Sequence, residues 1–276
     1  MPDQHPAGPL PVLLALHGGG GNAGQFQRSA GLDGLADSVG VIVVYPDGTG
    51  PIRGILLTWN AGTCCGPAAR DSVDDVGFLR RVVTDLATRT SIDSVRIYAT
   101  GHSNGGMMAW RLAAEAPDFV AAIAPVGGAM VTGVDPRSPV PVLHIHSKDD
   151  PRALYEGGLG PPFPGTQVRV SHPPVVRTLE TWRRVNRCHG TGETRSGVRW
   201  TYRRGEPDHT ATLISFEPCA TGAPVWHWRL TGAGHGWPGA PRSGPESLLG
   251  PRTDVISAPV EIWRFVSRFR LGRPAG

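Results

Sequence analysis

Six short and mostly apolar runs are spaced along the chain, at residues 11–16, 41–45, 95–99, 121–126, 142–145 and 225–230. A continuous apolar run of this length is typical of a strand that is buried on both faces of a parallel sheet. Helical patterns lie between these runs, at residues 71–89, 103–116, 175–185 and 259–269. Strands that alternate with helices predict an α/β fold, in which helices cover both faces of a mostly parallel sheet.

Two further segments complete the pattern. Residues 198–202 and 212–216 are expected to form a hairpin or edge pair. Residues 151–174 are rich in Gly and Pro and show little periodicity, so they are expected to form a loop that shapes a pocket. No composition shift or internal repeat marks a second domain, and residues 1–276 are therefore expected to form a single domain.

Composition and charge exclude several classes of function. The formal net charge is +4 and no block of basic residues is present, which argues against nucleic acid as a partner. No run of roughly 18 apolar residues occurs, so no membrane span is expected. The four cysteines fit no common zinc-binding spacing, and we expect neither a metal nor a cofactor.

The segment Gly101-His102-Ser103-Asn104-Gly105 follows an apolar run and precedes a helical pattern. A G-x-S-x-G pattern in this context is typical of a sharp strand-to-helix turn that exposes a catalytic serine. We therefore predict that Ser103 is a nucleophile. His102 is too close to Ser103 along the chain to point back at the serine oxygen, so it is predicted to serve packing.

A serine nucleophile needs a base and an acid that orients the base. His235 is predicted to be the base, because it lies in a glycine-flanked turn just after the last apolar run. The turn after residues 142–145 contains Asp149 and Asp150, and the chemistry alone does not choose between them. The order of nucleophile, acid and histidine along the chain is that of α/β-hydrolases.

The developing oxyanion of acyl transfer needs two backbone N–H donors. We predict Asn104, the residue after the nucleophile, and Gly19, in the run His17-Gly18-Gly19-Gly20-Gly21-Asn22. That glycine run lacks the ending of a phosphate-binding P-loop.

Trp59 and Trp237 are candidates for aromatic contacts with a substrate, with core packing as the alternative. Cys64 and Cys65 are adjacent and are expected not to bond to each other but to pack in a pocket wall.

Taken together, these motifs resemble the extracellular polyhydroxybutyrate depolymerase and feruloyl or acetylxylan esterase group of the α/β-hydrolases. The matching segments run in order from residue 11 to about 240: Leu16-His17-Gly18-Gly19, Trp59-Asn60-Ala61-Gly62 with Cys64-Cys65-Gly66, Asp74-Asp75-Val76-Gly77-Phe78, Gly101 to Gly106, the His146 to Pro151 turn, Trp182 with Asn186 and Cys188, and Gly234 to Gly239. The resemblance implies an α/β-hydrolase fold and a serine esterase that acts on polyester, feruloyl or acetyl esters.

The resemblance also implies specific residue roles. Ser103, Asp150 and His235 would form the catalytic triad, because the acid in such sequences stands four places after the histidine of the turn. The resemblance also supports a disulfide between Cys188 and Cys219, which would suit a secreted or periplasmic protein. The first residues lack the features of a signal peptide, which argues against a secreted or periplasmic location.

Three departures from the family pattern concern the substrate and the N-terminus. Only about ten residues precede the first motif, where family members carry additional strands. The turn begins His146-Ser147-Lys148 in place of the usual His-Gly-Thr, and residues 152–164 also differ.

Amide hydrolysis or acyl transfer on the same triad remains an alternative function. Another is a non-catalytic polymer binder that uses Trp226 and Trp228, although their alternation with His227 also suits a half-buried strand.

Overall fold

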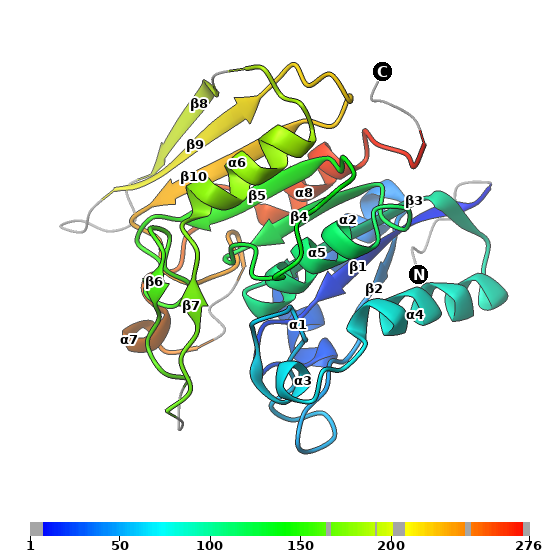
Figure 1. Ribbon diagram of the computed structural model, residues 1–276, viewed down its shortest axis with the longest axis horizontal. Helices are drawn as coiled ribbons and strands as arrows, with labels where there is room; N and C mark the ends of the chain where they lie inside the picture. Colours follow the sequence, from blue (N-terminus) through cyan, green and yellow to red (C-terminus); the bar gives the residue numbers. More distant parts are fainter. Residues whose placement is uncertain (1–7, 164–166, 191, 201–207, 241–243, 273–276) are drawn as a thin grey trace.

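The computed structural model describes residues 8–163, 167–190, 192–200, 208–240 and 244–272 (Figure 1). Its strands are β1 (Leu10–Leu16), β2 (Ile42–Val44), β3 (Ile92–His102), β4 (Ala122–Val126), β5 (Val142–Ser147), β6 (Gly158–Leu159), β7 (Ser171–His172), β8 (Glu193–Trp200), β9 (His209–Phe216) and β10 (Val225–Thr231). Its helices are α1 (Ala23–Ala30), α2 (Leu32–Val39), α3 (Gly66–Arg70), α4 (Asp75–Arg89), α5 (Asn104–Glu115), α6 (Val175–Val185), α7 (Glu246–Leu249) and α8 (Ala258–Val266).

Eight strands form the central sheet, in the order β2-β1-β3-β4-β5-β10-β9-β8. The strands from β2 to β10 pair in parallel, whereas β9 and β8 add an antiparallel pair at one edge. The carboxyl ends of the six parallel strands therefore meet at one edge of the sheet, where active sites of open α/β folds lie. The second sheet is the short antiparallel pair of β6 and β7.

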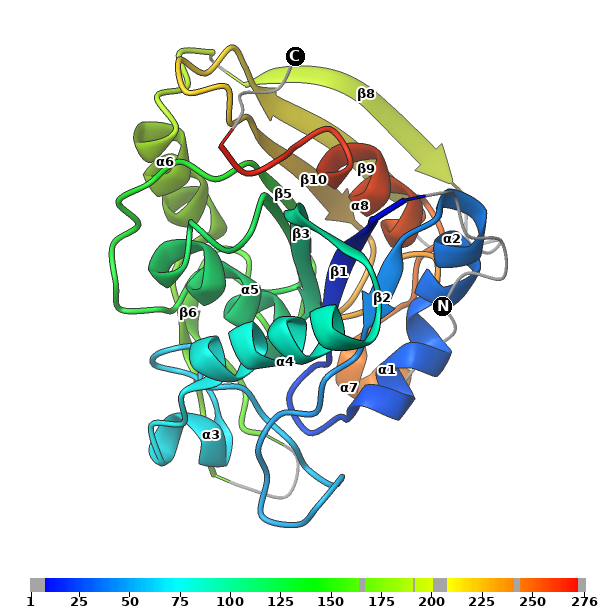
Figure 2. The ribbon, with the colours of Figure 1, turned by 90° about the vertical axis from the view of Figure 1, so that its right-hand side faces the viewer.

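The apolar side chains of the parallel strands divide between two cores. On β1, Leu13 and Ala15 face one core, and Val12, Leu14 and Leu16 face the other. Helices α1, α2 and α8 cover the first face, and α4, α5 and α6 cover the second, as Figure 2 shows. Because both faces are covered, these strands read as continuous apolar runs, and the predicted α/β-hydrolase architecture is confirmed.

Most predicted elements are present, with corrected ends. The predicted helix from residue 71 begins only at Asp75, because Asp74 is its N-cap and accepts a hydrogen bond from Gly77 N at 2.8 Å. The predicted helix at 259–269 ends at Val266. The predicted edge pair extends the main sheet as β8 and β9, although residues 201 and 202 of the prediction lie outside the described part. Helices α1, α2, α3 and α7 were not predicted.

A disulfide joins the segment after α6 to the loop between β9 and β10. Its partners are Cys188 and Cys219, the pair that the family resemblance implies. The bond therefore ties the antiparallel edge of the sheet to the helix that covers it. Across the described ranges, no helix combines the length and the apolar character that a membrane span needs.

Candidate active site

Ser103 occupies the sharp turn between β3 and α5. Its backbone has φ 53° and ψ −119°, in a region that non-glycine residues rarely adopt. The turn is held in place because Ser103 N donates a hydrogen bond to Val126 O of β4 at 2.8 Å. Backbone strain of this kind persists only where the surrounding structure enforces it, and it clusters at functional sites.

Two glycines make the turn possible. A Cβ atom at Gly101 would lie 2.5 Å from the backbone of Gly105, and one at Gly105 would overlap the carbonyl oxygens of Leu16 and His17. Helix α5 therefore packs directly against the end of β1 at this point. This contact explains why the G-x-S-x-G pattern carries glycine at both outer positions.

Asp150 and His235 are brought together from two neighbouring strands. Asp150 lies in the turn after β5, and His235 lies in the turn after β10. His235 Nδ1 donates a hydrogen bond to Asp150 Oδ2 at 2.7 Å. Asp149, the alternative acid, instead accepts a hydrogen bond from Gly232 N at 2.7 Å. The structure thus pairs Asp150, and not Asp149, with His235.

The carboxylate of Asp150 is buried and receives several donors. Its Oδ1 accepts hydrogen bonds from the backbone N–H groups of Arg152 and Ala153, both at 2.8 Å. Burial raises the pKa of Asp150, but the adjacent His235 and His146 rings outweigh burial and hold that pKa well below its usual range. Asp150 is therefore ionised at neutral pH and can stabilise a positive charge on His235.

Ser103 and His235 border the same short segment of β4 and the loop that follows it. The carbonyl of Val126 holds Ser103 N, and a Cβ atom at the next residue, Gly127, would lie 3.6 Å from His235 Cε1. The His102 ring lies 4.8 Å from the His235 ring, between centroids, and therefore packs against it as the sequence predicts. Burial lowers the pKa of His102 to about 3, so its ring stays neutral.

The two predicted oxyanion donors lie next to each other. A Cβ atom at Gly19 would lie 3.4 Å from Asn104 Cβ. Asn104 opens α5, and backbone N–H groups in the first turn of a helix have no carbonyl partner within the helix. The following loop amides are used by the fold, because Gly20 N donates to Leu57 O and Gly21 N donates to Gly18 O. This arrangement is compatible with Gly19 and Asn104 as donors.

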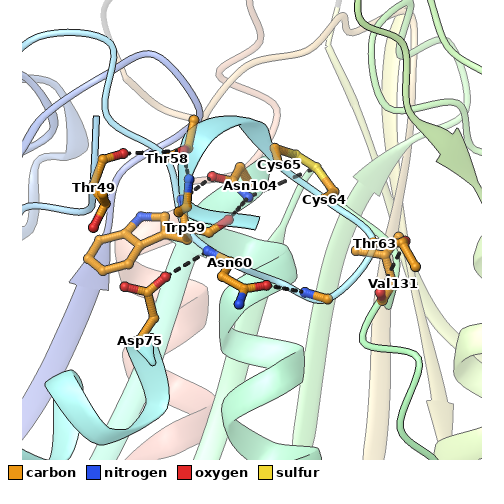
Figure 3. The surroundings of a disulfide bond; sticks show 12 residues. Thr49, Thr58, Trp59, Asn60, Thr63, Cys64, Cys65, Asp75, Asn104 and Val131 are labelled. Atoms are coloured by element: carbon orange, nitrogen blue, oxygen red, sulfur yellow. Dashed lines mark hydrogen bonds between the residues drawn. A yellow bond between two sulfur atoms is a disulfide. The ribbon is translucent and has the colours of Figure 1, made fainter. Parts of the chain in front are cut away.

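Side chains from α4 and α5 hold the Trp59-Asn60 segment, and two of them, Asp75 and Asn104, are drawn in Figure 3. Asn104 Oδ1 accepts from Trp59 N at 2.7 Å, and Asn104 Nδ2 donates to Trp59 O at 3.0 Å. Asp75, at the start of α4, accepts from Asn60 N at 2.7 Å. Arg111 of α5 donates to Asn60 O at 2.6 Å. The segment therefore fixes the start of α5, where the predicted nucleophile turn ends.

The burial of both candidate tryptophans argues against the predicted substrate contacts. Trp59 has no exposed surface, and its Nε1 donates to His17 O at 3.0 Å beneath the glycine-rich loop. Trp237 is 8% exposed, and its Nε1 donates to Ala30 O at 3.0 Å. Both indoles support the loops of the site from behind because their polar and apolar atoms are already engaged by the protein.

Cys64 and Cys65 are joined in a disulfide, contrary to the expectation that adjacent cysteines stay unbonded (Figure 3). The expectation of packing is confirmed, since both residues belong to a small apolar cluster with Met107 and Val131. Met107 lies one turn after the nucleophile on α5, and its backbone N–H donates to Ser103 O at 2.9 Å. The cysteine pair therefore stands behind the site.

The predicted pocket-shaping loop carries the β6–β7 pair. One of its residues, Phe163, packs on the apolar cluster behind Met107, and a Cβ atom at Gly19 would lie 3.7 Å from its ring. The sequence pattern predicts neither the place of Phe163 nor the approach of His146 to Asp150. The only sequence signal for Phe163 is that it is an aromatic residue within a Gly- and Pro-rich segment.

Comparisons with known proteins identify relatives across most of the chain. A putative esterase, NocK, from Nocardia uniformis subsp. tsuyamanensis is 35% identical over 83% of this chain and 66% of its own length. Feruloyl esterase B from Piromyces equi is 28% identical over 82% of this chain and 39% of its own length. Poly(3-hydroxyalkanoate) depolymerase C from Paucimonas lemoignei is 27% identical over 88% of this chain and 59% of its own length. The chain thus spans less than two thirds of the length of each of these relatives.

Solved structures share the fold. An acetyl xylan esterase from Aspergillus awamori superposes with a TM-score of 0.54 at 16% identity, over 85% of this chain and 86% of that one. The model of the family described as esterase PHB depolymerase matches residues 2–175, which is more than half of the sequence. The chain therefore belongs to the esterase PHB depolymerase family.

Proposed function

We propose that this protein hydrolyses carboxylic esters through an acyl-serine intermediate on Ser103. The observation that carries the proposal is the buried Asp150–His235 hydrogen bond of 2.7 Å, set at the sheet edge that also presents the strained Ser103 turn. Family membership supports the same chemistry.

The proposed reaction uses each residue for one task. His235 keeps its proton on Nδ1, where it donates a hydrogen bond to ionised Asp150, and Nε2 is therefore free to act as the base that removes the proton from Ser103. The serine oxygen attacks the ester carbonyl, and the backbone N–H groups of Gly19 and Asn104 stabilise the oxyanion. The protonated His235 then passes its proton to the leaving alcohol. A water molecule then attacks the acyl-enzyme by the same steps, and the acid is released.

The proposed substrates are polyesters of the polyhydroxyalkanoate type, or feruloyl and acetyl esters of sugars. The relative from Paucimonas lemoignei is named for the polyester class, and the relative from Piromyces equi is named for the feruloyl class. We also propose that the protein acts in a secreted or periplasmic location, because the disulfide between Cys188 and Cys219 would persist in an oxidising compartment.

Hydrolysis of a series of p-nitrophenyl esters, from acetate to decanoate, tests the proposal. Wild type should be active, and Ser103→Ala should lower kcat by about 10⁴ or more, as the loss of a triad nucleophile does in serine hydrolases. Ser38→Ala is the matched control, since Ser38 lies exposed on α2. Near-normal activity of Ser103→Ala would refute the mechanism.

The same preparation separates the remaining alternatives. The optimum along the ester series directs later assays to polyester films or to feruloyl and acetyl sugars. Activity on matched p-nitroanilides or transfer to added alcohols would instead favour an amidase or an acyltransferase. A folded wild type without any activity would favour a binding protein.

A further inference from the structure

Three histidines lie on one face of two neighbouring strands, directly behind the proposed catalytic acid. His144 and His146 come from β5, and His227 is the register partner of His144 on β10. All three side chains are buried, with at most 2% of each residue exposed. The rings pack on one another, with centroids 5.2 Å apart both between His144 and His146 and between His144 and His227. Catalysis through Ser103 and His235 assigns no role to them.

His146 differs from the other two because it reaches the proposed catalytic carboxylate. Its Nε2 lies 2.8 Å from Ala153 O and 3.3 Å from Asp150 Oδ2. A carbonyl oxygen can only accept, so Nε2 carries the proton and shares it between the two oxygens. Asp150 Oδ2 is the same atom that accepts the hydrogen bond from His235.

His146 and Ala153 together close a ring around the carboxylate. Ala153 N donates to Asp150 Oδ1, Ala153 O accepts from His146 Nε2, and that nitrogen also faces Asp150 Oδ2. With Arg152 N and His235 Nδ1, four nitrogen donors surround the two oxygens. The plane of the carboxylate is thereby fixed relative to β5, which is a rigid central strand.

We propose that His146 is a positioning residue, which holds the Asp150 carboxylate through its Nε2–H and so limits the basicity that Asp150 confers on His235. This inference rests on the proposed function of Asp150 and His235. An N–H donor to a carboxylate draws charge away from its other partners. Removal of the donor therefore leaves a carboxylate that stabilises protonated His235 more strongly but is aimed less well.

Titratable and charged groups from several elements face His146 and Asp150. Those from other elements are His102 of β3, His172 of β7, Tyr155 and Arg152 of the intervening loop, and His227 and Arg229 of β10. Burial lowers the pKa of His102 to about 3, of His172 to about 4 and of His227 to about 3, and it lowers the pKa of His144 on β5 itself. Burial raises the pKa of Tyr155 to about 12. The side chains of His102, His172, His227 and Tyr155 therefore stay uncharged between pH 5 and 9.

The first test compares His146→Leu with His146→Gln, using the pH dependence of kcat/KM for p-nitrophenyl acetate. In His146→Leu, the acid limb should move up by about half a pH unit, because an Asp150 carboxylate without this donor favours the protonated base more strongly, and kcat above that limb should fall about tenfold. His146→Gln should restore the limb, since its amide supplies an N–H donor at a similar reach. His144→Leu is the matched control, because His144 Nε2 faces Gly128 O and not Asp150.

A limb that stays in place or moves down in His146→Leu, in folded protein, would overturn the proposal, and so would an equal upward shift in His144→Leu. A second measurement does not depend on any variant. The ¹⁵N shifts of the wild-type imidazoles should show His146 as the Nε2–H tautomer at pH 8, and an Nδ1–H tautomer would overturn the inference. An inactive wild type would refute the proposed function, whereas the tautomer measurement would still decide the placement of His146.

Discussion

At the scale of single residues, the site depends on polar side chains that serve the backbone. Asn104 accepts from Trp59 N, Asp75 accepts from Asn60 N, and Arg111 donates to Asn60 O. The sequence predicts Ser103, His235 and the two candidate acids, because each follows an apolar run in the order that hydrolases use. It does not predict the clamp, since an Asp or Asn between apolar residues has many uses that only the folded contacts distinguish. The substrate role predicted for Trp59 and Trp237 is opposed by their burial.

Asp75 should make stability depend on pH. Burial raises the pKa of Asp75 from 3.8 to about 6 despite the Asn60 N–H and Arg111. The folded state therefore binds a proton more tightly than the unfolded state, and this contribution is fully present below pH 3.8 and lost as pH rises through 6. Asp75→Asn stays neutral and can still accept from Asn60 N. Thermal unfolding from pH 4 to 7 should show the variant gaining stability relative to wild type. Parallel curves for the two proteins would contradict this explanation.

At the scale of elements, apolar periodicity predicts those segments that contribute many buried residues. All six runs are strands of the sheet, and the pattern at 175–185 matches α6. Helices α1 and α2 escape prediction because each spans eight residues and buries only two, and Gly31 separates them. The start of α4 is shifted because a capping aspartate, and not periodicity, sets it. The start of α5 is predicted to within one residue, since the glycine spacing there reflects a steric requirement, whereas β3 continues to His102, beyond the predicted apolar run.

Gly105 should be intolerant of any side chain. Gly105→Ala places a methyl group against the carbonyls of Leu16 and His17, so β1 and α5 must separate. We expect a loss of about 1–3 kcal/mol in the free energy of unfolding. Gly34→Ala is the control, since Gly34 lies inside α2 with nothing within 4 Å of its Cβ position. That change should raise stability by about 0.5–1 kcal/mol. Chemical denaturation measures both, and equal effects of the two substitutions would refute the steric explanation.

At the scale of the whole molecule, the parallel sheet assembles the site from distant parts of the sequence. β3, β5 and β10 end at the same edge, so residues 103, 150 and 235 converge although more than 130 positions separate the first from the last. The sequence predicts this convergence from the order of strands and motifs. It does not predict which ring nitrogens face which oxygens, because side-chain orientation depends on contacts between strands that are far apart in the chain. The proposed role of His146 belongs to this second kind of information.

The most direct test of the account is covalent labelling of the wild-type protein with a fluorophosphonate, followed by peptide mass spectrometry. We predict a single adduct on Ser103, formed rapidly in wild type, slowly in His235→Ala and not at all in Ser103→Ala. The reagent needs a serine whose base and oxyanion donors are in place, so labelling reports the assembled site without any choice of substrate. Folded wild-type protein that resists the reagent, or an adduct on another residue that persists in Ser103→Ala, would contradict the account.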